Sequence, residues 1–417
     1  MYNLLTEKEA KGMKIFAKRV LSVLMVVLIM AAISTTGFAK EYVTTTEALQ
    51  FSQDGKFRIM HITDTHLEDE NIDDSVWLIA QACDREKPDL VVVTGDNVTN
   101  DDNADVVKAR IDKLMKIFQD RNIPTAITFG NHDSETGSMS REELMAYYNT
   151  YSCSISLDDG PSMSGCGTYN IPVKSSDGSE VKFNVWVFDS NDYDGNGHYG
   201  NVKADQVEWY KQKSDELRVA NGGEVVCSVA FQHIIVPEVY DALKKVDRKK
   251  LFSYEHIINK GEYYMFDPEG TNFGTLTETP CSGYENDGQF DAMVEKGDVL
   301  AMYTGHDHSN AFGVRHKGID ISNTVSSRYN RDSFSSQYGY RIIDIDEKDT
   351  SKYTSYVVHW YDMFSTADIN DIRKSGDTYG YKLALDVSFR GFFQKAIHVV
   401  SRRVVSVFTG RQISYAD

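Results

Sequence analysis

An early stretch of the chain alternates short apolar runs with longer amphipathic segments, and this alternation limits the fold more than any other feature. The runs 57–63, 89–95 and 124–130 are rich in β-branched residues and are bounded by turn residues, as is typical of strands buried on both faces. Between them, segments 73–87 and 103–122 carry apolar residues at helical spacing. This order predicts parallel strands with helices packed outside them.

The alternation continues further along the chain. Strands are expected at 182–190, 224–233 and 298–305, and helices at 203–220 and 287–297. The pattern therefore predicts an α/β protein with more than one sheet segment.

Two later regions depart from this alternation. Residues 254–290 are rich in Gly, Tyr, Asn and Glu and are expected to form one long irregular loop, a feature that is more often functional than accidental. The stretches 310–323, 339–346 and 354–361 are expected to be strands of an antiparallel run.

Polar side chains follow five of the predicted strands at the point where each strand ends. In open α/β sheets, sites form beyond the carboxyl ends of the strands, so segments far apart in sequence are expected to converge there. The segments are Asp64-Thr65-His66, Gly95-Asp96-Asn97, Gly130-Asn131-His132-Asp133, His233 and Gly305-His306-Asp307-His308.

Several of these side chains are of the kinds that bind metal ions. Imidazoles, carboxylates and one amide, without a thiolate, suit Mn, Fe or Zn rather than a cysteine-based structural zinc site. The set is too large for one ion and suits two ions that share one carboxylate. Two such ions ~3.5–4 Å apart can clamp the attacking and leaving oxygens of a phosphoryl displacement. The candidate ligands are Asp64, His66, Asp96, Asn131, His233, His306 and His308.

In chain order, the motifs D-x-H, G-D, G-N-H-D, H and G-H-x-H resemble those of the calcineurin-like metallophosphoesterase superfamily. The resemblance covers residues 57–361. It implies a four-layer α-β-β-α sandwich, in which two mixed sheets are flanked by helices. It also implies two metal sites that share Asp96. One site would use Asp64, His66, Asp96 and His308, and the other would use Asp96, Asn131, His233 and His306.

The resemblance gives the two residues after Asn131 catalytic roles. His132 would donate a proton to the leaving alkoxide, and Asp133 would orient the imidazole and fix its tautomer. Asn97, His198 and Arg328 are further candidates for substrate contact. His198 lies in a glycine-rich loop that could border the pocket. Asn97 and Arg328 have structural alternatives, which are a cap of the next turn for Asn97 and a solvated side chain for Arg328.

Three stretches, 204–217, 229–238 and 288–310, resemble the dose-dependent cell-cycle regulator branch of this superfamily, which is close to its purple-acid-phosphatase-like members. Purple acid phosphatases carry a tyrosine three residues after the shared aspartate. This chain has Thr99 at that position and offers His66 as a ligand instead. No tyrosine–iron colour is therefore expected.

These implications predict a metal-dependent phosphoric ester hydrolase that acts on a small-molecule phosphate ester. A metal-bridging hydroxide would attack phosphorus, and His132 would protonate the leaving group. A phosphomonoesterase is the favoured interpretation, with a phosphodiesterase or nucleotidase on the same core as the alternative. A non-catalytic, metal-stabilised surface-binding module is an alternative from another class. The formal charge of −18 disfavours binding to a nucleic-acid backbone.

The beginning of the chain has the pattern of a signal peptide. Lys14, Lys18 and Arg19 precede an apolar run at 20–32, and small residues follow, so cleavage is expected after Ala39. The protein is therefore expected to be secreted or cell-surface, and an uncleaved N-terminal membrane anchor is the alternative.

Export would permit disulfide bonds. Cys153 and Cys166 flank a loop that they could bridge, and Cys281 is a competing partner. Sequence alone leaves that pairing open.

Beyond the predicted domain, residues 390–411 have the pattern of a basic amphipathic helix. One interpretation is a final helix packed on an acidic body, and the other is a helix lying on an anionic membrane surface. The chain is thus divided into a signal peptide at 1–39, a lead-in segment at 40–56, a metallophosphoesterase domain at 57–361 and a C-terminal extension at 362–417.

Overall fold

The fold is taken from a computed structural model, which describes residues 48–99, 101–135, 137–157, 163–267, 269–330 and 338–392. The predicted signal peptide, the first part of the lead-in segment and most of the predicted basic helix lie outside these ranges. Within the described ranges, no helix is long and apolar enough to cross a bilayer.

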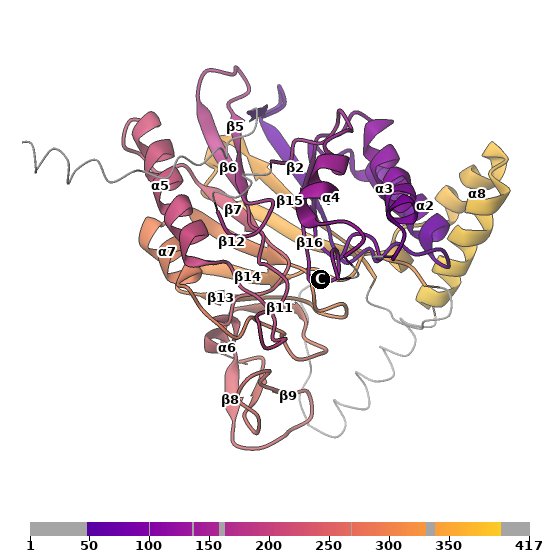
Figure 1. Ribbon diagram of the computed structural model, residues 1–417. Helices are drawn as coiled ribbons and strands as arrows, with labels where there is room; N and C mark the ends of the chain where they lie inside the picture. Colours follow the sequence, from indigo (N-terminus) through magenta and orange to yellow (C-terminus); the bar gives the residue numbers. More distant parts are fainter. Residues whose placement is uncertain are drawn as a thin grey trace, which may run out of the picture. The chain divides into compact units, whose positions relative to one another are not determined.

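Two large sheets form the centre of the fold (Figure 1). The first has five strands in the order β16-β15-β2-β3-β4. Its β2, β3 and β4 are parallel, whereas β15 is antiparallel to β2, and β16 is antiparallel to β15. The strands are β2 (Lys56–Ile62), β3 (Leu90–Thr94), β4 (Thr125–Thr128), β15 (Gly339–Asp346) and β16 (Tyr353–His359).

The second sheet has eight strands in the order β1-β5-β6-β7-β12-β14-β13-β11. Its central strands β6, β7, β12 and β14 are parallel, and antiparallel partners stand on either side of them. The strands are β1 (Leu49–Gln50), β5 (Tyr169–Lys174), β6 (Val181–Val187), β7 (Ser228–Phe231), β11 (Asn272–Thr275), β12 (Val299–Thr304), β13 (Ala311–His316) and β14 (Ile319–Asn323).

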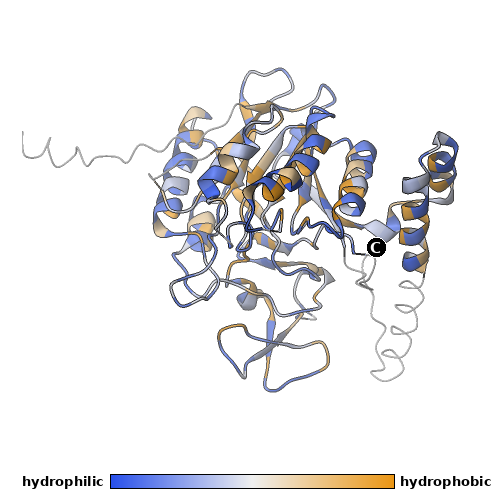
Figure 2. Ribbon diagram, turned by 45° about the vertical axis from the view of Figure 1, so that its right-hand side comes forward, coloured by the Kyte–Doolittle hydropathy of each residue, from blue (hydrophilic) through white to orange (hydrophobic). Residues whose placement is uncertain are grey.

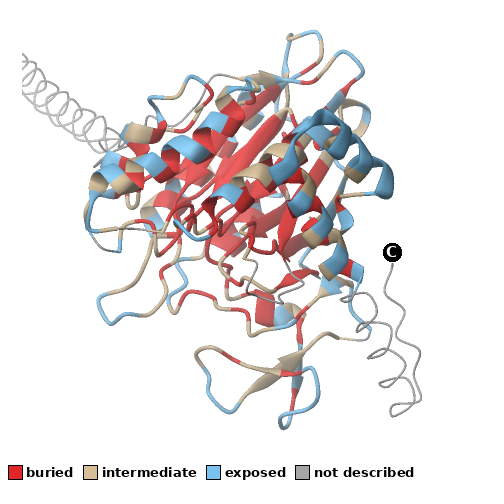
Figure 3. Cartoon of the chain, turned by 90° about the vertical axis from the view of Figure 1, so that its right-hand side faces the viewer, coloured by how far each residue is buried: buried red, intermediate tan, exposed pale blue. Residues whose placement is uncertain are grey.

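Side-chain alternation along the strands builds two cores. In β2, Phe57 and Ile59 belong to the core between the sheets, which also takes in strands of the second sheet. Met60 and Ile62 point to the opposite face and belong to the core beneath the helices. Because both faces of the central strands are covered, these strands are buried almost throughout (Figure 3), whereas the edge strands β16, β11 and β1 are partly exposed.

Helices cover the outer face of each sheet. Against the first sheet pack α2 (Ile72–Glu86), α3 (Ala104–Gln119) and α4 (Arg141–Tyr148). On the second sheet lie α5 (Ala204–Ala220) and α7 (Gln289–Lys296), where the aromatic rings of α5 pack on Trp186. These helices carry apolar and polar residues on different faces (Figure 2). The predicted four-layer α-β-β-α sandwich is confirmed.

The structure corrects two expectations. The region 254–290 is not one irregular loop, because it contains β9 (Tyr254–Glu255), β10 (Tyr263–Met265) and β11. β9 and β10 join β8 (Lys244–Val246) in a separate three-stranded sheet. The late strands are not one antiparallel run either. β13 and β14 belong to the second sheet, where β14 pairs parallel to β12, and β15 and β16 belong to the first.

The segment after β16 packs against the first helical layer. It contains α8 (Thr366–Ser375) and a further helical stretch that is described as far as residue 392. Leu383 and Val387 join the core beneath α2. Tyr329 donates a hydrogen bond to Asp386 at 2.8 Å. The predicted basic helix at 390–411 lies almost wholly outside the described residues. No disulfide bond joins the cysteines, all of which lie in described parts of the chain.

Candidate metal centre

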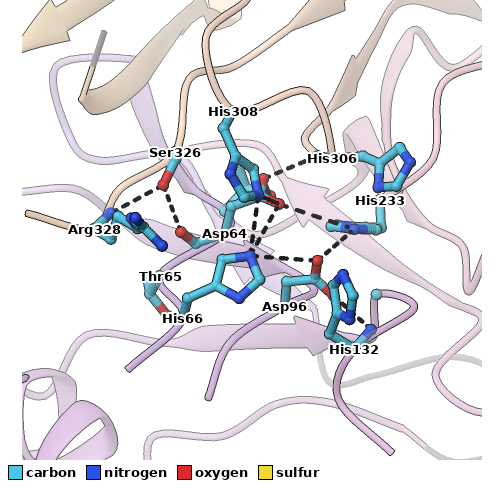
Figure 4. A network of polar contacts seen from close by, with 12 residues as sticks. Asp64, Thr65, His66, Asp96, His132, His233, His306, His308, Ser326 and Arg328 are labelled. Atoms are coloured by element: carbon cyan, nitrogen blue, oxygen red, sulfur yellow. Dashed lines mark hydrogen bonds and ion pairs between the residues drawn. The ribbon is translucent and has the colours of Figure 1, made fainter. Parts of the chain in front are cut away.

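Five strand-end loops from the two sheets meet at one place (Figure 4). Their side chains form two groups whose ligand atoms lie within 4.8 Å of one another, and Asp96 belongs to both. The first group is Asp64, His66, Asp96 and His308, and the second is Asp96, His233 and His306. These are the groupings that the family resemblance implied, apart from the amide of Asn131.

Within the first group, the two imidazoles face the two carboxylates. His66 Nε2 lies 3.0 Å from His308 Nε2 and 3.5 Å from Asp96 Oδ2. His308 Nε2 lies 3.4 Å from Asp64 Oδ1. Four atoms that can each offer a lone pair therefore surround a common space.

The second group lies deeper in the fold. His233 is fully buried, and its Nε2 lies 3.3 Å from Asp96 Oδ2. The Oδ1 atom of Asn131 and the Nε2 atom of His306 are also buried.

Five buried atoms of this cluster accept or donate no hydrogen bond within the described chain. Buried polar groups are normally satisfied, so a set of unsatisfied atoms in one place needs an explanation. All five are oxygen or imidazole nitrogen atoms that can coordinate a metal ion. They are Asp64 Oδ1, Asp96 Oδ2, Asn131 Oδ1, His233 Nε2 and His306 Nε2.

In four of these side chains, those of Asp64, Asp96, Asn131 and His233, the other polar atom is engaged, which fixes the direction in which the free atom points. Asp64 Oδ2 accepts from the His306 backbone N–H at 2.9 Å and from the Thr63 hydroxyl at 2.8 Å. Asp96 Oδ1 accepts from the His132 backbone N–H at 2.9 Å. His233 Nδ1 donates to the Thr94 carbonyl oxygen at 2.7 Å, so Nε2 is the ring nitrogen that faces the cluster.

The backbone around the cluster is strained. Asp64, His66, Asp96 and His306 have φ values of 50°, 37°, 49° and 70°, in the left-handed region that few non-glycine residues adopt. Each such residue costs roughly 1–3 kcal/mol and persists only where the surroundings over-determine it. Strain of this kind gathers at functional sites, which is consistent with a metal centre here.

Glycine precedes three of the ligand residues because there is no room for a side chain. A Cβ at Gly130 would lie 2.7 Å from His233 Nε2 and would collide with Asp96 Oδ1. A Cβ at Gly305 would collide with the side chains of Thr63 and Asp64. The glycines of the G-N-H-D and G-H-x-H motifs thus allow two loops to approach within contact distance.

Asp133 does not orient His132, and this corrects the role expected from the resemblance. Its carboxylate is buried and accepts the backbone N–H groups of Asp96, Asn97 and Gly130 at 2.8, 2.9 and 2.7 Å. Burial and the charge of Asp96 raise the pKa of Asp133 to about 6. Asp133 therefore ties the loop after β3 to the loop after β4, and it is too deep to reach the exposed imidazole.

Glu135 is the partner of His132 instead. Oε2 of Glu135 lies 2.6 Å from Nδ1 of His132, and both side chains are partly exposed. The His132 ring lies at the edge of the cluster, 5.7 Å from the ring of His66. Because Glu135 engages Nδ1, the other ring nitrogen, Nε2, is left for a substrate. Sequence reasoning missed Glu135, although its three-residue spacing from His132 was a visible signal.

Tyr193 was missed as well, and it connects this pair to the ligand set. Its hydroxyl oxygen accepts from Nδ2 of Asn131 at 2.8 Å and donates to Oε1 of Glu135 at 3.3 Å. Burial raises the pKa of the Tyr193 phenol, which keeps its proton in place near neutral pH. By holding Nδ2, Tyr193 turns Oδ1 of Asn131 toward the cluster.

The three candidate substrate contacts lie in different surroundings. Asn97 is fully buried and donates to the Thr128 carbonyl oxygen at 3.2 Å, so a substrate cannot reach it and the expected contact is wrong. His198 pairs with Asp194 at 2.9 Å and stacks on Tyr284. Arg328 stands at the edge of the cluster beside Ser326 (Figure 4) and remains a candidate for phosphate contact.

Opposing effects act on the protons of the cluster. Burial raises the pKa of Asp96, but His233 and His66 outweigh it, so the carboxyl titrates below its usual range. Burial lowers the pKa of His233, but the Asp96 and Asp64 carboxylates outweigh it and raise the pKa to about 10. Without a metal ion, the positive charge of protonated His233 balances the two carboxylates. Metal binding would replace this charge and release the proton.

The donor set fits two divalent or trivalent ions. It consists of carboxylate, amide and imidazole groups, and Asp64, Asp96, Asn131 and His233 are each held in place by a hydrogen bond at their other polar atom. One carboxylate, that of Asp96, belongs to both groups, which suits two adjacent ions. The donors suit Mn, Fe or Zn equally.

Comparison with known proteins agrees with this geometry. A family model described as calcineurin-like phosphoesterase matches residues 57–310. A protein named "Probable inactive purple acid phosphatase 14" from Arabidopsis thaliana is 27% identical over 309 residues, which are 66% of this chain and 71% of that protein. A protein named "Phosphatase DCR2" from Saccharomyces cerevisiae is 30% identical over 297 residues, or 65% of this chain and 47% of that protein.

A solved structure of a dimetal phosphatase from Danio rerio is 13% identical, with a TM-score of 0.45, and covers 72% of this chain and 98% of its own. That likeness is too distant to carry an argument by itself. The family match spans well over half of the chain and contains the strand-end loops that form the cluster. The chain therefore belongs to the calcineurin-like phosphoesterase family.

Proposed function

We propose that this chain is an active dinuclear metal-dependent phosphoric ester hydrolase, with phosphomonoesters as its preferred substrates. The observation that carries the proposal is the set of five buried, unsatisfied ligand atoms around a shared carboxylate. A fold retains unsatisfied buried groups only where something compensates their cost, and two metal ions would satisfy all five.

Asp64, His66, Asp96 and His308 would hold one ion, and Asp96, Asn131, His233 and His306 would hold the other. When bound, such ions polarise phosphate oxygens and lower the pKa of a water molecule. The protein supplies the geometry, because backbone N–H groups and Tyr193 hold the ligands in place before a substrate arrives.

His132 would act as the general acid. Its Nδ1 is engaged by Glu135, so its free Nε2 can carry a proton to the oxygen of the leaving group. Glu135 keeps the ring in one tautomer and one orientation, and Tyr193 holds Glu135 in turn. Asp133 contributes indirectly by holding the loop on which His132 stands.

The names of the relatives disagree on whether they are catalytically active. The plant relative is named as probably inactive, whereas the yeast relative is named a phosphatase. In this chain the complete ligand set and the His132–Glu135 pair support turnover. A phosphodiesterase or nucleotidase on the same core is the alternative substrate class.

The test is to strip the purified full-length protein with a chelator, reload it with Mn²⁺ or Zn²⁺, and measure hydrolysis of aryl phosphate monoesters and diesters beside the bound metal content. We expect two ions per chain and faster turnover of the monoester. As a control, Asp371→Asn removes one negative charge on exposed α8, and this variant should behave like the parent protein. If the loaded protein binds metal but hydrolyses neither ester, the metal-stabilised surface module replaces this proposal.

We also propose that the protein is exported, on the basis of the N-terminal sequence alone. Cleavage after Ala39 would give a mature chain that begins at Lys40. Mass spectrometry of the N-terminus of protein recovered from an expressing culture tests this, and an intact N-terminus in the membrane fraction would favour the anchor.

A further inference from the structure

The three-stranded sheet of residues 244–265, here called the small sheet, stands apart from the two central sheets (Figure 1). Only Val246, Ser253 and His256 in it are buried, so it has almost no core of its own. Its base is nevertheless well attached. Tyr240 stacks on His256 with ring centroids 3.8 Å apart, and Tyr254 donates to the Leu276 carbonyl oxygen at 3.1 Å.

The turn between β8 and β9 presents two adjacent large apolar side chains to solvent. Leu251 is 69% exposed and Phe252 is 54% exposed. Ser253 closes the turn by hydrogen bonds with the backbone N–H and carbonyl of Lys250 at 2.7 and 2.8 Å. Phe252 has a φ of 61°, a left-handed conformation that is unusual for a bulky residue. The turn thus holds the aromatic ring outward at a cost in backbone strain.

Three basic residues directly precede these two side chains in the sequence. Residues 247–252, here called the tip, are all exposed and have the sequence Asp-Arg-Lys-Lys-Leu-Phe. At the base of the small sheet, Lys244 and Lys245 pair with Asp267 and Glu262. No such ion pair to a described residue engages the cations of the tip, Arg248, Lys249 and Lys250. Within the tip, Asp247 is the one acidic residue, in a chain whose formal charge is −18.

We propose that the tip docks on an anionic membrane surface. Leu251 and Phe252 would enter the boundary between headgroups and acyl chains, while Arg248, Lys249 and Lys250 would contact lipid phosphates. A lipid surface is the partner that uses both features, since it offers negative charge and an apolar layer at adjacent depths. A polyanion without an apolar layer would leave Leu251 and Phe252 in water.

This inference does not depend on hydrolysis at the metal centre, because the tip contributes no side chain to the cluster. Its role would be to hold the protein, and with it any activity, at a membrane surface. Three cations and two apolar side chains form a small contact, so binding should be reversible and sensitive to salt.

The experiment is co-sedimentation of the full-length protein with vesicles of phosphatidylcholine, with and without phosphatidylglycerol. The parent protein should bind the anionic vesicles and lose binding as salt rises. Lys249→Glu should lower the partition coefficient by at least about fivefold, since each cation near an anionic surface contributes about that factor. Lys174→Glu, at an exposed position on β5, is the matched control and should bind like the parent protein.

Two further variants test the apolar part. Leu251→Ser combined with Phe252→Ser should reduce binding, whereas Val219→Ser, at a 78% exposed position on α5, should not. In Phe252→Trp, the fluorescence of the tryptophan at position 252 should shift to the blue on anionic vesicles. Brominated lipid should quench this fluorescence. The proposal is overturned if the parent protein binds no anionic vesicle, if the serine double variant binds as well as the parent, or if the tryptophan stays in water while the protein is bound.

Discussion

The metal cluster and the tip of the small sheet are both built on strained backbone, yet they hold it in opposite ways. Asp64, His66, Asp96 and His306 adopt left-handed conformations inside a buried network of backbone hydrogen bonds. Phe252 adopts one in a turn closed only by Ser253, with its ring in solvent.

The difference indicates what each region is organised to meet. In the cluster, almost every polar atom is satisfied except those that face one common space, which is typical of a site for small ions. At the tip, apolar and cationic groups are exposed together, which is typical of contact with an extended surface. Changes in the cluster should therefore alter hydrolysis, and changes at the tip should leave it intact.

Asp96→Asn should have the largest effect on activity. It removes the negative charge that both ligand groups share, while it keeps the size of the side chain. We expect kcat/KM to fall by roughly 10³-fold or more and bound metal to fall below two ions per chain, since the ions contribute several kcal/mol of charge stabilisation. Steady-state kinetics and elemental analysis measure both quantities. Unchanged turnover in this variant would separate the cluster from the activity.

His132→Ala should rank second, with a fall in kcat of about 10²-fold and no loss of metal. The imidazole lies at the edge of the cluster and contributes no atom to either ligand group. The loss should be greater for alkyl phosphates than for nitrophenyl phosphates, because a poor leaving group needs protonation more. An equal loss for both leaving groups would contradict the role of general acid.

Glu135→Gln should lower kcat by about tenfold and leave KM nearly unchanged, as is usual for a residue that orients a catalytic group. The glutamine keeps the size of the side chain but weakens the hydrogen bond to Nδ1 of His132. In the background of His132→Ala the same change should have no further effect. A tenfold loss that persists without the imidazole would show that Glu135 acts by another route.

Asp133→Asn tests whether Asp133 and Glu135, the two acidic residues near His132, have different roles. The substitution weakens three charge-assisted hydrogen bonds from backbone N–H groups, so the free energy of unfolding should fall by about 1.5–3 kcal/mol. Chemical denaturation measures this, with Glu135→Gln as the comparison, since Glu135 is partly exposed and its change should hardly affect stability. Equal stability of the two variants would contradict the structural role of Asp133.

Sequence could predict the parts of the site where a metal-binding type of residue directly follows a predicted strand. Each of Asp64, Asp96 and His306 follows a strand that periodicity identifies, and parallel strands bring their carboxyl ends together. The same logic predicted parallel strands with helices outside them, whereas the four layers were implied by the family resemblance. The wrong partner was assigned to His132 because Asp133 is its neighbour in sequence. The chain turns sharply there, so Asp133 points inward to the backbone while Glu135 reaches the ring.

What sequence could not predict depends on long-range packing of irregular segments. Tyr193 reaches Asn131 from a glycine-rich loop more than sixty positions away, and no periodic pattern in the sequence predicts that contact. The small sheet was hidden for a related reason, because strands of two or three residues are too short to show alternation. Its exposed Leu-Phe pair has meaning only once the turn is seen to hold both side chains outward.

The tip should give the smallest effect on hydrolysis and so complete the comparison. With Leu251→Ser and Phe252→Ser together, kcat/KM toward a soluble aryl phosphate should stay within about twofold of the parent value, since exposed substitutions away from buried networks change stability little. Thermal unfolding should be equally unaffected. The measurement is the same kinetic assay that is used for Asp96→Asn, with vesicle binding recorded beside it. A large loss of turnover on the soluble substrate would mean that the small sheet supports the metal centre, and the separation between the two regions would then fail.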